Sequence, residues 1–271
     1  MLKQRVITAV ILALIVAVCL LQQDPLWMRL LFTVMLCAAT YELILLTLRT
    51  TRPLAITGAL PFIALFWWSG DYVNALLIFW QSLTGAVLWV LISIGLCFYR
   101  HSGNWPLLAR VLLLGLGLDL LWICGHGLVF LHLHYGAAVL FYLLSLVWVA
   151  DIGAYFIGKR FGRHKLAPSI SPGKTREGLL GGLASSLLWM IVVYQASAGW
   201  GLALLPFLLI GVITSLSSVF GDLFESVLKR EAGVKDSSRL LPGHGGVLDR
   251  IDGLLAATPV FLSGILFAGQ M

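Results

Sequence analysis

The sequence predicts an all-α integral membrane protein with about nine transmembrane helices in a single polytopic domain, residues 1–271. The chain is 60% hydrophobic and 11% charged, whereas a soluble domain carries about 25% charged residues. Its mean hydropathy of +0.97 indicates more apolar side chains than a protein interior can bury, so many of them must face lipid. Because one span needs about 20 apolar residues, the length leaves no room for a separate soluble domain.

The spans follow from nine apolar runs separated by polar or turn-forming residues. The first run, at 6–21, follows Lys3 and Arg5, as the apolar core of a signal peptide would. The sequence after it is Gln-Gln-Asp-Pro rather than a small-residue cleavage site, so we expect a retained helix. The other runs lie at about 30–48, 53–69, 73–99, 107–131, 136–157, 179–198, 201–222 and 251–269.

The basic residues predict the orientation of these spans. If the N-terminus is inside, all of the 18 Lys and Arg residues except Arg29 fall on inner segments. Cytoplasmic loops are enriched in Lys and Arg, so we expect a cytoplasmic N-terminus and a C-terminus outside. This pattern explains the net charge of +6, and we expect no nucleic-acid partner. The four cysteines lie singly in apolar runs, which argues against disulfides and a zinc site.

Two inner loops are richer in polar residues than the others: loop A, residues 158–178, and loop B, residues 223–250. Both are predicted on the same side of the membrane. We therefore expect the chemistry of this protein on the cytoplasmic side.

The carboxylates in and beside loop B predict a metal site. Asp222, Ser226 and Lys229 share one helix face, together with Glu225, if the eighth helix continues past the membrane. Asp249 and Asp252 share a face at the start of the ninth helix. Two such helix ends suit Mg²⁺, which is held by one or two carboxylates plus phosphates and water.

The alternative interpretation is that these charges are solvated and only orient the chain. It is weakest for Asp222 and Asp252, which lie at or within apolar spans, where an ionisable group is costly.

The centre of loop B suits phosphate. The glycines of Pro242-Gly-His-Gly-Gly246 allow positive φ and close approach to a ligand, and successive amides in such a turn can cradle an anion. Cationic partners for phosphate stand nearby, namely Lys229, Arg230, Lys235, Arg239 and Arg250.

Loop A contains Gly173-Lys174-Thr175, which resembles the end of a P-loop. Pro168 stands where that motif needs glycine, and no strand precedes it, so a Walker A site is rejected. Ser171, Lys174 and Thr175 remain candidates for phosphate contacts just before the seventh helix.

Other intramembrane charges leave their role open. Glu42 and Asp119 are site residues, helix-pairing contacts or linings of a substrate groove. Asp151 lies inside the sixth helix without a cation near it in sequence.

Loop B also resembles the signature of a known family. It reads Ser226-x-Leu-Lys-Arg-x4-Lys235-Asp236-x-Ser-x2-Leu-Pro-x-His244-Gly-Gly-Val-x-Asp249-Arg250-Ile-Asp252, which is similar to the bacterial phosphatidate cytidylyltransferases (CDP-diacylglycerol synthases). Loop A adds Lys165-Leu-x-Pro-x-Ile-Ser-Pro-Gly-Lys-Thr-x-Glu-Gly178, and the N-terminus adds Met-Leu-Lys-x-Arg. The resemblance runs along the whole chain, but its specificity lies in the two loops.

The resemblance implies an enzyme of the bacterial inner membrane that joins CTP to phosphatidic acid, with membrane lipids around it and Mg²⁺ as cofactor. A second cation and a homodimer are left open. Helices to about 131 would form an N-terminal half, and 136–271 the catalytic half. The implied metal ligands are Asp222, Asp249 and Asp252, and the implied catalytic residues are Lys229, Asp249, Arg250 and Ser226. The implied substrate-binding residues are Ser171, Lys174, Arg230, Lys235, Asp236, His244, Gly245 and Gly246.

Two alternatives remain. A CTP-dependent lipid-alcohol kinase shares the need for CTP and membrane, but the full loop B signature argues against it. An ion-coupled transporter would use Glu42, Asp119, Asp151 and Asp222 as an ion path, and would place polar residues toward both faces of the membrane.

Overall fold

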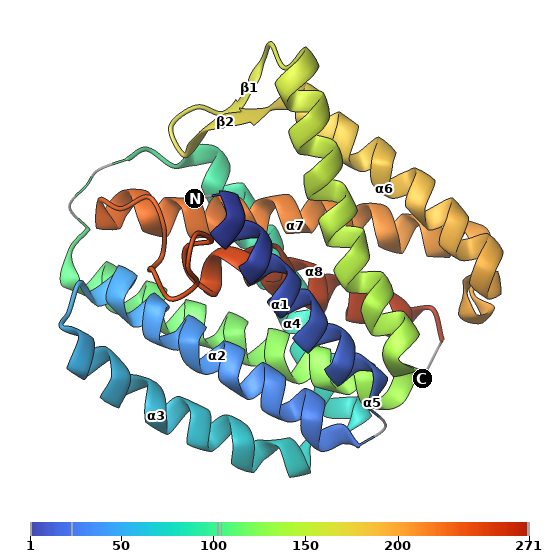
Figure 1. Cartoon of the computed structure of the whole chain (residues 1–271), viewed down its shortest axis with the longest axis horizontal. Coiled ribbons are helices and arrows are strands. Elements are labelled where there is room, and N and C mark those ends of the chain that lie inside the picture. Colours follow the sequence, from blue (N-terminus) through green and yellow to red (C-terminus); the bar gives the residue numbers. More distant parts are fainter. Residues whose placement is uncertain (1, 23, 102, 104, 270–271) are drawn as a thin grey trace.

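The computed structural model describes residues 2–22, 24–101, 103 and 105–269. The side chains at 2–6, 9 and 25 lie outside this description, and with them the predicted inner charges of Lys3 and Arg5. The described chain is a bundle of long helices topped by a short hairpin (Figure 1). The elements are α1 (Leu2–Leu21), α2 (Pro25–Leu48), α3 (Arg52–Ser69), η1 (Gly70–Tyr72), α4 (Ala75–Phe98), α5 (Leu107–Phe161), β1 (Lys165–Ala167), β2 (Ser171–Thr175), α6 (Arg176–Ser197), η2 (Ala198–Gly201), α7 (Leu204–Ala232) and α8 (Leu248–Phe267).

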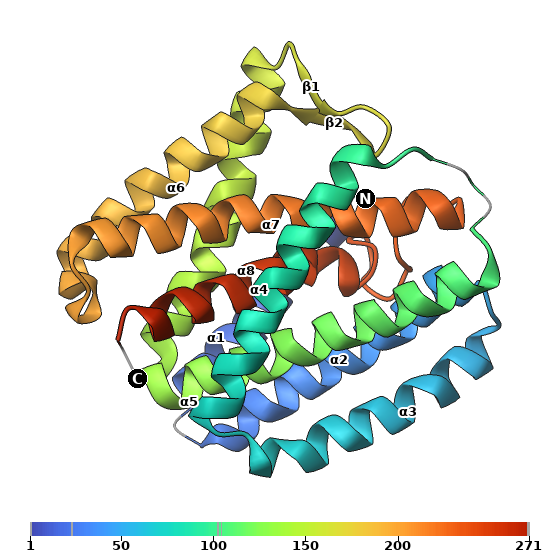
Figure 2. The same cartoon turned by 180° about the vertical axis from the view of Figure 1, so that it is seen from behind.

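Helix α5 combines two of the predicted spans. Gly136 has φ 81°, a conformation that favours glycine, and the chain turns back there (Figures 1 and 2). Dividing α5 at Gly136 gives nine α-helical segments in the described chain, besides η1 and η2, one for each predicted apolar run. Within the described residues, seven helices are long and apolar enough to cross a membrane when α5 is counted once, and α1 adds the shorter run Val10–Leu21. The membrane class is confirmed; the number of spans stays a prediction.

Loop A departs from the all-α prediction. Its residues Lys165–Ala167 pair antiparallel with Ser171–Thr175. Thr175 then caps α6, its Oγ1 accepting from the amide of Gly178 at 3.1 Å. Hydropathy along the chain does not reveal so short and local a hairpin.

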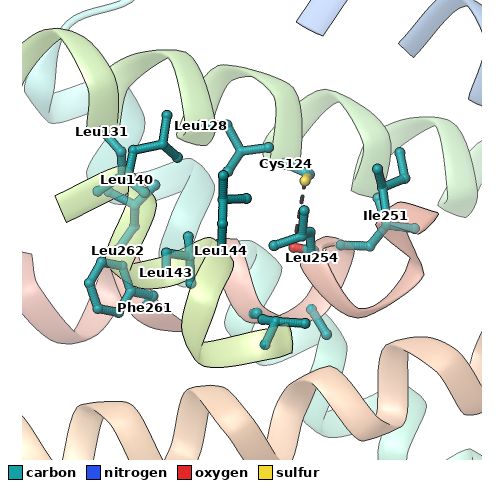
Figure 3. Packing of buried hydrophobic residues seen from close by; sticks show 14 of the residues in the cluster. Cys124, Leu128, Leu131, Leu140, Leu143, Leu144, Ile251, Leu254, Phe261 and Leu262 are labelled. Carbon is teal, nitrogen blue, oxygen red and sulfur yellow. Dashed lines mark hydrogen bonds between the residues drawn. The ribbon is translucent and has the colours of Figure 1, made fainter. Parts of the chain in front are cut away.

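Helix α8 is the centre of the bundle. In the apolar stretch of α8 that is long enough to cross a membrane, 72% of the residues are buried, against 17% in the corresponding stretches of α3 and α6. Figure 3 shows leucines from both halves of α5 packed on one side of α8, and Cys124 Sγ donates to the carbonyl of Leu254 at 3.5 Å. Cys124 is thus a buried apolar residue as expected, whereas Cys97 is exposed on α4.

Close packing of α7 on α8 depends on Gly221. A Cβ on Gly221 would collide with the backbone carbonyl of Asp252. The missing side chain therefore lets the two helices approach where Asp222 and Asp252 stand.

Charged side chains make contacts at both ends of the bundle. At the end that carries loop B, Arg49 donates to the carbonyl of Glu231, and Tyr99 donates to its carboxylate. Burial and this hydrogen bond raise the pKa of Tyr99, which stays a donor. At the other end Arg29, the basic residue assigned to an outer loop, pairs with Asp71 at 2.8 Å.

The contact at Gly221 predicts a stability effect. Gly221→Ala should lower the unfolding free energy by about 1–3 kcal/mol, because the added methyl forces α7 from α8. Thermal unfolding in detergent measures this. Gly115→Ala is the matched control, since a Cβ there meets nothing within 4 Å, and helical Gly→Ala is neutral or stabilising by about 0.5–1 kcal/mol. Equal melting temperatures for the two variants would contradict the packing argument.

Candidate active site

The site is built where α7 ends, loop B turns and α8 begins. Helix α7 continues to Ala232, so the predicted shared face exists. On it Ser226 Oγ donates to Asp222 Oδ1 at 3.2 Å, and Lys229 Nζ contacts Glu225 Oε2 at 2.6 Å. The continuation of the helix is what aligns these groups.

Lys229 joins the two helices. Its Nζ also lies 2.6 Å from Asp249 Oδ1 on α8, with side-chain exposures of 13% for Lys229 and 9% for Asp249. Buried charges are tolerated when they are paired and hydrogen-bonded. In this arrangement Lys229 stabilises two carboxylates and contacts the predicted metal ligand Asp249 directly.

Asp249 holds the turn of loop B. Its Oδ2 accepts from the amide of Ser237 at 2.9 Å, the hydroxyl of Ser237 at 2.8 Å and the amide of Gly246 at 2.8 Å. Gly245 beside it has φ +84°, and a Cβ there would lie 2.8 Å from Asp249 Oδ2. Both oxygens of Asp249 are therefore committed to the protein.

Glu42 of α2 also accepts hydrogen bonds from this turn. This fully buried carboxylate accepts from the amides of Val247 at 3.0 Å and Leu248 at 2.7 Å, at the start of α8. Ser238 Oγ donates to it at 2.6 Å, and Ser237 Oγ lies 3.1 Å away. A negative charge at a helix N-terminus is favourable. The sequence marked Glu42 only as an ionisable residue in an apolar span.

Gly246 is required between these carboxylates. A Cβ there would collide with Ser237 Oγ and approach the Glu42 oxygens to 2.5 and 2.6 Å. The glycine predicted for close approach to phosphate thus permits close approach of the protein's own acids.

A cavity of about 550 Å³ with several charged and hydroxyl side chains in its lining opens between α5, β2, α6 and α7. Lys174 projects into it from β2 and pairs with Asp222 Oδ2 at 2.6 Å. The structure thus places Ser171, Lys174 and Asp222 around one cavity, and adds Asp151, whose role the sequence left open. We call this cavity the Lys174 pocket.

The other predicted substrate-binding residues lie elsewhere. His244 and Arg250 line a second, largely apolar cavity against α1 and α2. Arg230 donates to the carbonyl of Ile170 at 3.2 Å and ties α7 to loop A. Lys235 and Asp236 are exposed on loop B.

The residues fit a divalent cation only in part. Among the described residues, no three His, Cys, Asp or Glu side chains form a metal-binding group. Asp252 Oδ1 accepts from the amide of Gly253 at 2.8 Å, and its Oδ2 has no hydrogen-bond partner in the described chain. The negative charges of Asp222 and Asp151 repel that of Asp252.

Mg²⁺ is held by one or two carboxylates together with phosphate oxygens and water, so Asp252 fits with its remaining oxygen. Asp222 fits only if phosphate takes Lys174 from its Oδ2, since its Oδ1 accepts from Ser226. Asp249 is bound more fully, by Lys229 and by three hydrogen bonds from loop B.

The chain matches the profile of the cytidylyltransferase family over residues 3–267. A phosphatidate cytidylyltransferase of Pseudomonas aeruginosa is 45% identical over 196 residues, covering 69% of this chain and 72% of that protein. Proteins of the same name from Haemophilus influenzae and Bacillus subtilis are 50% and 45% identical. Those two alignments cover just under half of this chain, 47% and 46%, and 46% of each relative.

Glu42 predicts how strongly loop B is held. In Glu42→Gln one acceptor oxygen becomes an NH₂ group that faces donors, and each charge-assisted bond lost costs about 1.5–3 kcal/mol. Trypsin should then cut at the exposed Lys235 and Arg239 at least about tenfold faster, because cleavage follows the open population. Asp71→Asn, at the opposite end of the bundle, should leave the rate unchanged. Unchanged cleavage in Glu42→Gln would refute the role.

Proposed function

Because the chain belongs to the cytidylyltransferase family, we propose that it joins CTP to phosphatidate, forming CDP-diacylglycerol and pyrophosphate. The observation that carries this proposal is the Lys174 pocket, where a lysine from loop A meets Asp222 of α7 at 2.6 Å. The pocket offers cation, hydroxyl and carboxylate together, which suits a nucleoside triphosphate with its counter-ion.

The reaction needs no protein nucleophile. A phosphate oxygen of phosphatidate, already anionic near neutral pH, attacks the α-phosphorus of CTP. A new P–O bond forms, the bond between the α- and β-phosphates breaks, and pyrophosphate leaves with the electron pair. The task of the protein is to hold two polyanions together and to stabilise charge on the α-phosphate and the leaving group.

Lys174 and Ser171 bind the phosphates of CTP in this proposal. The ammonium of Lys174 neutralises Asp222 until phosphate oxygens compete for it. Ser226 acts through its hydrogen bond to Asp222, and Lys229 positions Asp249 and Glu225.

Bound Mg²⁺ supplies positive charge to the phosphates. Asp222 and Asp252 would hold it. Asp249 would join them only by exchanging the ammonium of Lys229, so its first role is to position loop B.

The proposed setting is a bacterial inner membrane crossed nine times, with loops A and B in the cytoplasm where CTP is found. The distribution of basic residues supports this orientation. In a chain without its own cysteines, Val234→Cys should react with an impermeant maleimide from the cytoplasmic side and Tyr72→Cys from the outside; both positions are exposed. The reverse result would refute the orientation.

The assay that tests the reaction uses purified chain, phosphatidic acid, labelled CTP and Mg²⁺. Phosphatidate cytidylyltransferase activity releases pyrophosphate and forms a CDP-lipid. A CTP-dependent kinase would release CDP, and a transporter would consume no CTP.

Lys174→Ala should raise the KM for CTP about 10-fold or more, the worth of one charge-assisted hydrogen bond. The KM for phosphatidic acid should change much less, because Lys174 lines the proposed nucleotide pocket and not the other cavity. Lys165→Ala is the control, since Lys165 is exposed on β1 and is not part of the pocket lining. Equal effects on both substrates would count against the assignment.

The two aspartates of α8 should differ. Asp252→Asn should lower the rate by about 10³-fold, as expected for a lost metal ligand, while loop B stays resistant to trypsin. Asp249→Asn should lower the rate and also expose loop B, because it removes an acceptor of three hydrogen bonds. Near-normal turnover and Mg²⁺ dependence in Asp252→Asn would overturn the metal assignment.

A further inference from the structure

A second cavity, of about 350 Å³, lies under α1 and shares no lining residue with the Lys174 pocket. We call it the α1 groove. Its walls come from α1, α2, the second half of α5 and the start of α8, and Figure 1 shows α1 lying across this face. Nearly all of its lining is aliphatic or aromatic: Leu12, Ala13, Ile15, Val16, Leu20, Met28, Leu31, Phe32, Met35, Leu140, Leu144, Trp148, Leu241, Val247, Ile251 and Leu254.

One end of the groove is cationic. Arg250 and His244 are its polar lining residues. The guanidinium of Arg250 donates twice to the carbonyl of His244, at 3.2 and 2.6 Å, and this orients it. Among the described residues Arg250 forms no salt bridge. An exposed, oriented guanidinium above an apolar groove matches a ligand with an anionic head and a hydrocarbon tail.

The groove adjoins the lipid-facing surface. Ile7, Ile11, Leu14 and Val18 on α1 are exposed apolar side chains, each more than 40% exposed. The N-terminal part of α1 is anchored to loop B, because Thr8 Oγ1 donates to the carbonyl of Pro242 at 3.0 Å. A lipid can therefore reach the groove from the bilayer while its head lies beside loop B.

We propose that the α1 groove holds the acyl chains of phosphatidate, with the phosphate bound by Arg250. This assignment rests on the proposed function and gives Arg250, predicted as a catalytic residue, and His244, predicted to bind substrate, a role at the lipid. Helix α5 separates the two substrates: Trp148 lines the groove, and Asp151, one helical turn further, lines the Lys174 pocket. Arg250 interacts with Asp151 electrostatically across this boundary. The Lys174 pocket and the α1 groove thus meet the second half of α5 one helical turn apart.

Photo-crosslinking tests the groove without relying on turnover. The full chain in phosphatidylcholine vesicles, without CTP, is irradiated with phosphatidic acid that carries a diazirine on one acyl chain. Label is expected on the groove side of α1, residues 12–16, and at Leu144 or Trp148. Excess unlabelled phosphatidic acid should suppress it, and excess phosphatidylcholine should not. Label spread over the outer faces of α3 and α4, or equal suppression by both lipids, would overturn the proposal and indicate surrounding lipid only.

Matched variants on α1 sharpen the test. Ala13→Trp fills the groove and should lower specific labelling about tenfold, which corresponds to about 1.4 kcal/mol of binding. Ala17→Trp, one turn along and exposed outside the lining, should change it less than about twofold. Arg250→Gln should abolish the preference for phosphatidic acid over phosphatidylcholine. Equal labelling in the two tryptophan variants, or an unchanged preference in Arg250→Gln, would refute the site.

The two proposals fail separately. Specific groove labelling without pyrophosphate release from CTP would refute the reaction and support the lipid site. Normal pyrophosphate release without groove labelling would refute the lipid site and leave the reaction standing.

Discussion

The candidate site depends on two carboxylates that accept hydrogen bonds from the turn before α8. Glu42 accepts from the first amides of α8, and Asp249 accepts from Ser237 and Gly246. Burying a carboxylate is costly unless it is paired or fully hydrogen-bonded, and each bond to a charged group is worth about 1.5–3 kcal/mol. The hydrogen bonds offset the cost of burying the two carboxylates only in one conformation of loop B. The two acids therefore select that conformation.

Small residues make this arrangement sterically possible. Without a side chain, Gly221 lets α7 touch the backbone of Asp252, and Gly246 lets the turn enter the space between Ser237 and Glu42. Tight interiors transmit small displacements. A methyl group added at either glycine would therefore move the carboxylates relative to one another, and the geometry of the site is coupled to helix packing.

Two lysines offset part of the negative charge of the site before any substrate binds. Lys174 faces Asp222, and Lys229 lies between Glu225 and Asp249. Paired charges are stable at this depth, where isolated ones are not. In the proposed function a triphosphate would enter by exchange, its phosphate oxygens replacing Asp222 as the partner of Lys174. The division between a polar pocket and an apolar groove matches substrates of opposite solubility.

The sequence by itself determined the membrane class, the apolar runs that match the helical segments, and the motifs of loops A and B, because hydropathy and periodicity are local properties. It also determined the shared face of Asp222, Ser226 and Lys229, since helical spacing is local. Only the tertiary structure decided which residues far apart in the sequence form hydrogen bonds with one another. The bonds from Val247 and Leu248 to Glu42 span 205 and 206 residues, and nothing local marks such partners. Likewise Lys174 and Arg250, both predicted for phosphate, lie in different cavities because helix packing separates them.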